Sequence, residues 1–148
     1  MKIHELDVKI YYEDTDCAGV VYYANYLKYF ERARTEMFES TCKPLTKLME
    51  EGIQFVVAEA ALKYHRPGRY ADRLTIQSWI QEFGHVTIVF GHRVLRKETS
   101  EVLVTGQVKI ASVSDNLRPV RLPPEIKEAM SIFVNDEDKG LADTKRDN

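Results

Sequence analysis

The chain reads ANYLKYFERARTEMFES over residues 24–40, and this segment decides the fold. Apolar residues recur in it at three- and four-residue spacing, which is typical of one face of an amphipathic helix. They are Tyr26, Tyr29, Phe30, Ala33, Met37 and Phe38. The segment therefore predicts a long helix with one apolar face to bury.

On the C-terminal side of this helix the hydrophobic period changes to two, which indicates strands. The change comes after Gly52, and Pro67-Gly68 interrupts the alternation once. Four strands are predicted, over residues 54–66, 74–82, 86–95 and 102–113. Gly84-His85 predicts a hairpin turn between the second and the third of them.

Shorter elements complete the predicted order. Residues 6–12 predict a first strand with Val8, Ile10 and Tyr12 on one face. Two short helices are also expected, one between Pro44 and Gly52 and one from Pro123-Pro124 to about Phe133. The predicted class is α+β, a curved antiparallel sheet wrapped around the long helix. Such a sheet leaves its edges open, so edge-to-edge dimerisation is expected.

Composition limits the classes of function. The length of 148 residues predicts one domain, placed at residues 1–134, and a disordered acidic tail at residues 135–148. Five of the 23 acidic residues and three of the 21 basic residues lie in that tail, which leaves 18 of each in the body. A nucleic-acid binder needs a net basic face, so this neutral body predicts no nucleic-acid partner.

The sequence also predicts a cytoplasmic protein without membrane insertion. It contains no apolar run of membrane-spanning length, and its first residues lack the apolar core of a signal peptide. Cys17 and Cys42 are well separated and form no disulfide framework. The four histidines show no metal-binding spacing, so no metal site and no cofactor are expected.

The loop before the long helix holds the candidate site. Asp16 and Gly19 lie there, just ahead of the expected helix start. A helix start offers unpaired N–H groups and the positive end of a dipole. A carboxylate beside it can attack, or activate water against, a carbonyl whose oxygen binds those groups. The alternative is an aspartate that only caps a helix or a turn.

Several of these residues form a pattern that resembles a known family. The pattern is YEDTD at residues 12–16, GVVY at 19–22, Asn25-Tyr26, Tyr29 and ERAR at 31–34. It resembles the 4-hydroxybenzoyl-CoA thioesterase-like hotdog proteins, and most closely the YbgC-type acyl-CoA thioesterases. The resemblance implies the hotdog fold and hydrolysis of acyl-CoA, with CoA as leaving group. It also implies a homo-oligomer, either a dimer or a dimer of dimers, with sites at the subunit interface.

The same resemblance assigns the catalytic roles. Asp16 matches the family's catalytic aspartate, as nucleophile or as general base, and Tyr23 matches the residue whose backbone N–H polarises the thioester carbonyl. YbgC-type proteins usually carry His at the position of Tyr23, so a step that needs a His side chain there is not expected. Gly19 is expected to supply a backbone shape that a side chain forbids, and to let substrate approach closely. Cys17 is a rival nucleophile that lacks a nearby base in sequence.

Substrate contacts are expected from four further residues. Tyr22 and Asn25 belong to the motif, and Arg66 and Arg69 lie in the densest basic stretch, where they are suited to the phosphates of CoA. Glu31 and Arg34, one helical turn apart, are expected to form an ion pair that orders the loop. Two alternatives stay open: hydrolysis of acyl groups on acyl carrier protein, and a hotdog protein that binds acyl-CoA without turnover.

Overall fold

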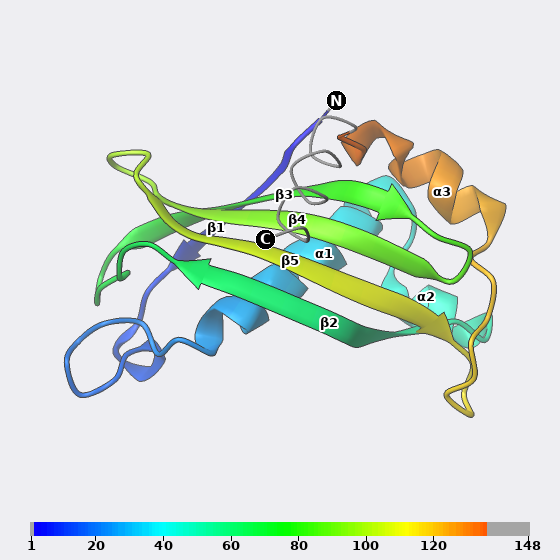
Figure 1. Ribbon diagram of the computed structural model, residues 1–148, viewed down its shortest axis with the longest axis horizontal. Helices are drawn as coiled ribbons and strands as arrows, with labels where there is room; N and C mark the ends of the chain where they lie inside the picture. Colours follow the sequence, from blue (N-terminus) through cyan, green and yellow to red (C-terminus); the bar gives the residue numbers. More distant parts are fainter. Residues whose placement is uncertain (1, 136–148) are drawn as a thin grey trace, which may run out of the picture.

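A five-stranded antiparallel sheet forms one layer of the molecule, and the helix α1 lies against one face of it (Figure 1). The computed structural model describes residues 2–135. The spatial order of the strands is β1-β3-β4-β5-β2. The strands are β1 His4–Lys9, β2 Gln54–Tyr64, β3 Arg73–Phe83, β4 Thr87–Arg96 and β5 Val102–Val113. The helices are α1 Asn25–Thr41, α2 Leu45–Glu50 and α3 Pro124–Met130, with short 3-10 turns η1 Tyr12–Asp14 and η2 Ser131–Phe133.

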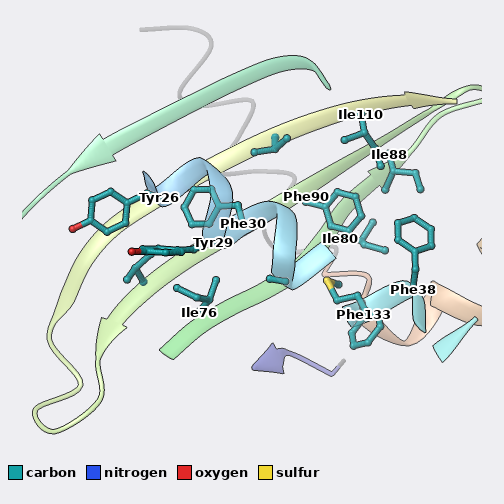
Figure 2. Packing of buried hydrophobic residues seen from close by; sticks show 14 of the residues in the cluster. Tyr26, Tyr29, Phe30, Phe38, Ile76, Ile80, Ile88, Phe90, Ile110 and Phe133 are labelled. Atoms are coloured by element: carbon teal, nitrogen blue, oxygen red, sulfur yellow. The ribbon is translucent and has the colours of Figure 1, made fainter. Parts of the chain in front are cut away.

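The core lies between α1 and the sheet. Tyr26, Tyr29, Phe30, Ala33, Met37 and Phe38 are all buried, as the helical period predicts. Figure 2 shows the aromatic residues of this helix face packed against isoleucines and Phe90 of the sheet. A Cβ atom added at Gly106 would lie 2.6 Å from Phe30 Cε2, so glycine there lets the helix approach the sheet. The predicted fold class, a sheet packed around a long helix, is confirmed.

One strand is shorter than predicted. β1 ends at Lys9, and Tyr12 is 80% exposed rather than on the core face with Val8 and Ile10. The cause is local: the Asp14 carboxylate accepts a hydrogen bond from Tyr11 N at 2.8 Å, which turns the chain into η1. Alternation along residues 6–12 does not reveal this turn, because Tyr is also common in strands.

β2 forms one edge of the sheet and is mostly uncovered. Within residues 2–135 it pairs only with β5, so its other edge carries no strand. Apart from Gln54, Phe55 and Leu62, its residues are exposed, and Val57 is 56% exposed. Eight of its eleven residues are apolar, and an exposed edge strand of this kind is a template for pairing with another chain. Glu59, Lys63 and an irregular register between Val57 and Glu59 interrupt it.

Polar groups are buried midway along α1. Arg34 is 7% exposed and its Nη1 lies 3.3 Å from His92 Nε2, while Ser78 Oγ lies 2.7 Å from His92 Nδ1. Arginine only donates, so Nε2 accepts and Nδ1 carries the proton that is donated to Ser78. The His92 ring also stacks on Phe30 with centroids 4.4 Å apart.

The expected ion pair between Glu31 and Arg34 is wrong. Within the described residues no ion pair joins them, and Glu31 is exposed whereas Arg34 is buried. Arg34 lies four residues from both Phe30 and Phe38, so it belongs to the buried stripe of the helix. Burial lowers the pKa of Arg34 to about 10, and burial together with the Arg34 charge holds the pKa of His92 well below its usual value.

The two ends of the described chain lie close to β3. Lys2 N donates to Ile132 O at 2.7 Å, and Asn135 N donates to Ile80 O at 2.9 Å. The expected disordered tail, apart from Asn135, lies outside the described residues. No helix within residues 2–135 is long and apolar enough to cross a membrane. Cys17 and Cys42 are both free thiols.

Candidate active site

The loop that carries Asp16 is a tight hairpin held by backbone hydrogen bonds. Thr15 and Val21 form an antiparallel bridge, and Asp16 N donates to the carbonyl oxygen of Val20 at 2.9 Å. Gly19 N closes a turn onto Asp16 O at 3.0 Å. Gly19 has φ of +77°, a left-handed conformation that favours glycine, and a Cβ atom there would meet nothing within 4 Å. Within the protomer, conformation and not crowding explains this glycine.

The Asp16 carboxylate is exposed, and one of its oxygens is fixed. Oδ1 accepts a hydrogen bond from Ala18 N at 2.9 Å, which is the Asx turn expected of a structural aspartate. Oδ2 bonds to no other residue within 2–135. The turn therefore orients the carboxylate and leaves its second oxygen available for chemistry.

A second loop, residues 67–72, packs against this hairpin. Val21 N donates to Gly68 O at 2.8 Å, and Tyr70 N donates to Gly19 O at 3.1 Å. A Cβ atom on Gly68 would lie 3.1 Å from the Tyr26 hydroxyl and 3.2 Å from Val21 Cγ2. The sequence marks Gly68 only as a strand break, whereas the structure makes it the contact point between the two loops.

The two arginines proposed for substrate binding are placed differently. Arg69 forms a bridge with Val20, so its backbone adjoins the Asp16 hairpin. Arg66 is 66% exposed and its Nε lies 3.8 Å from Glu101 Oε2. Sequence reasoning did not single out Arg96, which donates to Pro67 O at 3.0 Å and to Asp72 Oδ2 at 3.3 Å and so fixes the second loop.

The start of α1 completes the site. Asn25 N donates to Tyr22 O at 2.9 Å, and Ala24 has φ of −73° and ψ of −17°, which together describe a type I turn leading into the helix. No side chain caps this helix start. Among residues 2–135, no acceptor is assigned to the N–H of Tyr23 or of Ala24. Both remain available to bind an oxygen of a ligand.

One carbonyl ties the hairpin to the helix start. The carbonyl oxygen of Asp14 accepts from Tyr22 N at 2.9 Å and from Asn25 Nδ2 at 2.8 Å. The Asn25 side-chain nitrogen, which the sequence assigned to substrate, is thus bonded within the protein. Asp14 therefore has a structural role, through its carbonyl here and through its carboxylate at Tyr11 N.

The tyrosines at the helix start form a chain of ring contacts. Tyr26 is buried, but Tyr23 is 62% exposed and Tyr22 is also exposed, so these two are not core residues. Ring centroids lie 4.8 Å apart for Tyr22 and Tyr23, and 6.4 Å apart for Tyr23 and Tyr64. Tyr64 comes from β2, 41 positions beyond Tyr23 along the chain, and in the sequence it reads only as one more apolar position of a strand.

An exposed carboxylate oxygen and two N–H groups without an assigned acceptor among the described residues lie on segments joined through the Asp14 carbonyl. These are the kinds of group that acyl transfer uses: a carboxylate as nucleophile or base, and hydrogen-bond donors for the oxygen of the acyl group.

Comparisons with known proteins identify the family of this chain. Residues 18–103 match the family model of the thioesterase superfamily. The chain is 38% identical over 120 residues to the acyl-CoA thioester hydrolase YbgC of Escherichia coli O6:H1, covering 80% of this chain and 89% of that protein. It is 39% identical over 124 residues to the acyl-CoA thioesterase YbgC of Haemophilus influenzae, covering 82% and 90%.

A solved structure of a related protein has the same fold. A probable thioesterase from Bartonella henselae is 32% identical and superposes with a TM-score of 0.77, covering 82% of this chain and all of that one. The resemblance inferred from the residue pattern is thus confirmed by sequence and by structure. The chain belongs to the thioesterase superfamily, as a hotdog-fold thioester hydrolase of the YbgC type.

Proposed function

We propose that this protein hydrolyses acyl-CoA thioesters to a free acid and CoA. The relatives named above support the substrate class. The observation that carries the mechanism is the Asp16 carboxylate, which the Ala18 N–H holds by Oδ1 while Oδ2 stays unbonded to the described residues. CoA is the leaving group in this reaction and not a cofactor.

Asp16 can act by two routes. As a nucleophile, an Asp16 oxygen attacks the acyl carbon, the C–S bond breaks to release CoA thiolate, and water then hydrolyses the mixed anhydride. As a general base, Asp16 takes a proton from water while that water attacks the acyl carbon, and the departing thiolate is protonated afterwards. In both routes the thioester oxygen becomes negative and accepts a hydrogen bond from the Tyr23 N–H.

The substitution Asp16→Asn tests the role of the carboxylate. The amide oxygen of Asn can still accept from Ala18 N, so the turn is retained and only the charge is lost. We expect kcat to fall by roughly 10³-fold or more, with binding of acyl-CoA intact. Near-normal turnover would remove Asp16 from the mechanism. Cys17→Ala is the matched control in the same loop and should remain active.

Trapping experiments separate the two routes. A mixed anhydride at Asp16 would react with hydroxylamine, leaving a hydroxamate on that residue that mass spectrometry of the digested protein detects. The general-base route forms no such adduct. A rapid-quench burst of CoA equal to the enzyme concentration supports the nucleophilic route if anhydride hydrolysis is the slow step.

We also propose that the active protein is a homodimer formed through the free edge of β2. The support is the exposed apolar strand described above, since pairing it with a second copy would satisfy its unused backbone groups. Val57→Lys places a charge on that edge and should give monomers in analytical ultracentrifugation. If Val57→Lys sediments as the wild type does, the contact lies elsewhere.

A further inference from the structure

Two neighbouring peptide units at the start of α1 present the unbonded N–H groups. The Tyr23 N–H belongs to the peptide whose carbonyl, that of Tyr22, accepts from Asn25 N at 2.9 Å. The Ala24 N–H belongs to the peptide whose carbonyl, that of Tyr23, accepts from the Tyr64 hydroxyl at 3.1 Å. A trans peptide is planar, with its C=O and N–H pointing in opposite directions. Whatever holds the carbonyl therefore also aims the N–H.

The first peptide is held by the helix itself and the second by a side chain from elsewhere in the fold. Tyr64 is the last residue of β2, and Figure 1 shows that end of β2 beside the start of α1. Its ring contacts the rings of Tyr23 and Tyr26, with centroids 6.4 and 5.9 Å away. A tyrosine hydroxyl is protonated near neutral pH, and partial burial raises the pKa of Tyr64 further, so its hydroxyl remains a donor.

We propose that Tyr64 is a positioning residue for thioester hydrolysis. Its hydroxyl fixes the Tyr23–Ala24 peptide so that the Ala24 N–H joins the Tyr23 N–H in binding the thioester oxygen. Two donors fixed before the reaction stabilise the developing negative charge without reorganising during it. This inference rests on the proposed acyl-CoA hydrolysis and adds a second donor, together with the residue that holds it.

The placement of Tyr64 also connects the active site to the dimer edge. Tyr64 pairs with Val104 of β5 on one side, and β2 offers its other side for the partner subunit. A dimer that orders the end of β2 would thereby order the Tyr23–Ala24 peptide.

The test removes one hydroxyl. Tyr64→Phe keeps the ring contacts and loses only the hydrogen bond to Tyr23 O. In a thiol-release assay with the acyl-CoA that the wild type hydrolyses fastest, kcat should fall about tenfold, less than for complete loss of one donor, with KM within twofold of wild type. Tyr70→Phe is the matched control, since Tyr70 is exposed and its hydroxyl has no assigned hydrogen bond to residues 2–135. It should hydrolyse at the wild-type rate.

Two inhibitors separate positioning of the oxyanion donors from a general structural effect. An S-alkyl CoA thioether lacks the thioester carbonyl oxygen and should bind wild type and Tyr64→Phe equally. A trifluoromethyl ketone analogue of acyl-CoA, whose adduct or hydrate carries the oxygen in tetrahedral form, should bind Tyr64→Phe more weakly by the factor lost in kcat. Equal weakening of both inhibitors, or a change in KM alone, would overturn the proposal.

The outcomes also distinguish this inference from the proposed function. If wild type hydrolyses acyl-CoA, Asp16→Asn does not, and Tyr64→Phe matches wild type, only the inference about Tyr64 fails. If wild type hydrolyses no acyl-CoA in a panel of short, long and aromatic acyl groups, the proposed function itself fails.

Discussion

The first turn of α1 and the middle of α1 differ in the burial and the hydrogen bonding of their polar groups. At the start, the N–H groups of Tyr23 and Ala24 are left without acceptors in the described chain, and the side chains of Tyr22 and Tyr23 are exposed. Midway, Arg34, His92 and Ser78 are buried and bonded to one another. An unpaired polar group is costly only when it is buried. The exposed start of α1 can therefore leave N–H groups unpaired at little cost, and these groups can bind a substrate. The difference predicts that substitutions at the start change catalysis and those in the middle change stability.

Among the substitutions that compare these two regions, removing one N–H at the helix start is expected to have the largest effect. Tyr23 occupies the second position of a type I turn, where proline is favoured, so Tyr23→Pro removes the N–H without opposing the turn. We expect kcat to fall by roughly 10²- to 10³-fold, with little change in Tm. Tyr23→Ala, which keeps the N–H, is the control for the lost side chain. Equal kcat in the two variants would show that the donor lies elsewhere.

The next largest effect is on stability and concerns the buried cluster of Arg34, His92 and Ser78. His92→Ala removes a stacked ring and leaves the Arg34 guanidinium without its acceptor, so the free energy of unfolding should fall by about 3 kcal/mol or more. Urea unfolding followed by circular dichroism measures this loss. Activity per folded molecule should stay close to wild type. If His92→Ala is as stable as wild type but inactive, the prediction that the middle of α1 determines stability and not catalysis is wrong.

A smaller effect follows from the pKa of His92. In the folded protein burial and then Arg34 hold this pKa well below 6.5, so at acid pH the unfolded chain binds a proton that the folded chain does not. Stability should be unaffected by His92 above about pH 7.5 and fall below pH 6.5 by up to about 1.4 kcal/mol per pH unit. Burial lowers the pKa of His4 too, which adds in the same direction.

Thermal unfolding at pH 7.5 and 5.5 measures this dependence. His4→Gln and His92→Gln divide it between the two residues, with the larger share expected at His92, which is fully buried. If His92→Gln loses as much stability on acidification as wild type, His92 is already protonated in the fold.

The smallest effect separates the two arginines. Arg69 lies against the Asp16 hairpin through its bridge to Val20, whereas Arg66 lies beside Glu101. Arg69→Glu should raise KM for acyl-CoA several-fold through repulsion of phosphate, and Arg66→Glu should raise it less. Both effects should shrink as ionic strength rises. Unchanged KM in a doubly reversed variant would dismiss both residues as phosphate contacts.

The sequence predicts local features of this protein well and long-range contacts poorly. The period of residues 24–40 marks the buried face of α1, and Asp16 and Gly19 mark a loop ahead of it, although not that this loop is a hairpin. The contacts of Tyr64 with Tyr23, of Gly68 with Tyr26 and of Arg34 with His92 join residues at least 41 positions apart. Periodicity contains no information about such pairs. Even the short-range prediction for Glu31 and Arg34 failed, because the pairing was inferred from charge, whereas the spacing of Arg34 from Phe30 and Phe38 places it on the buried face.

The way the Asp16 hairpin is attached bears on how such enzymes diversify. Its contacts with Gly68 and Tyr70 run between backbone groups, as do the bonds from Gly19 N to Asp16 O and from Tyr22 N to Asp14 O. The side chains of Asp16 and Asn25 add bonds to this frame. Side chains at Cys17, Ala18 and Tyr70 can therefore be exchanged by mutation while the reactive frame persists. Substitutions at these positions could therefore change which acyl groups bind while the backbone around Asp16 keeps its arrangement.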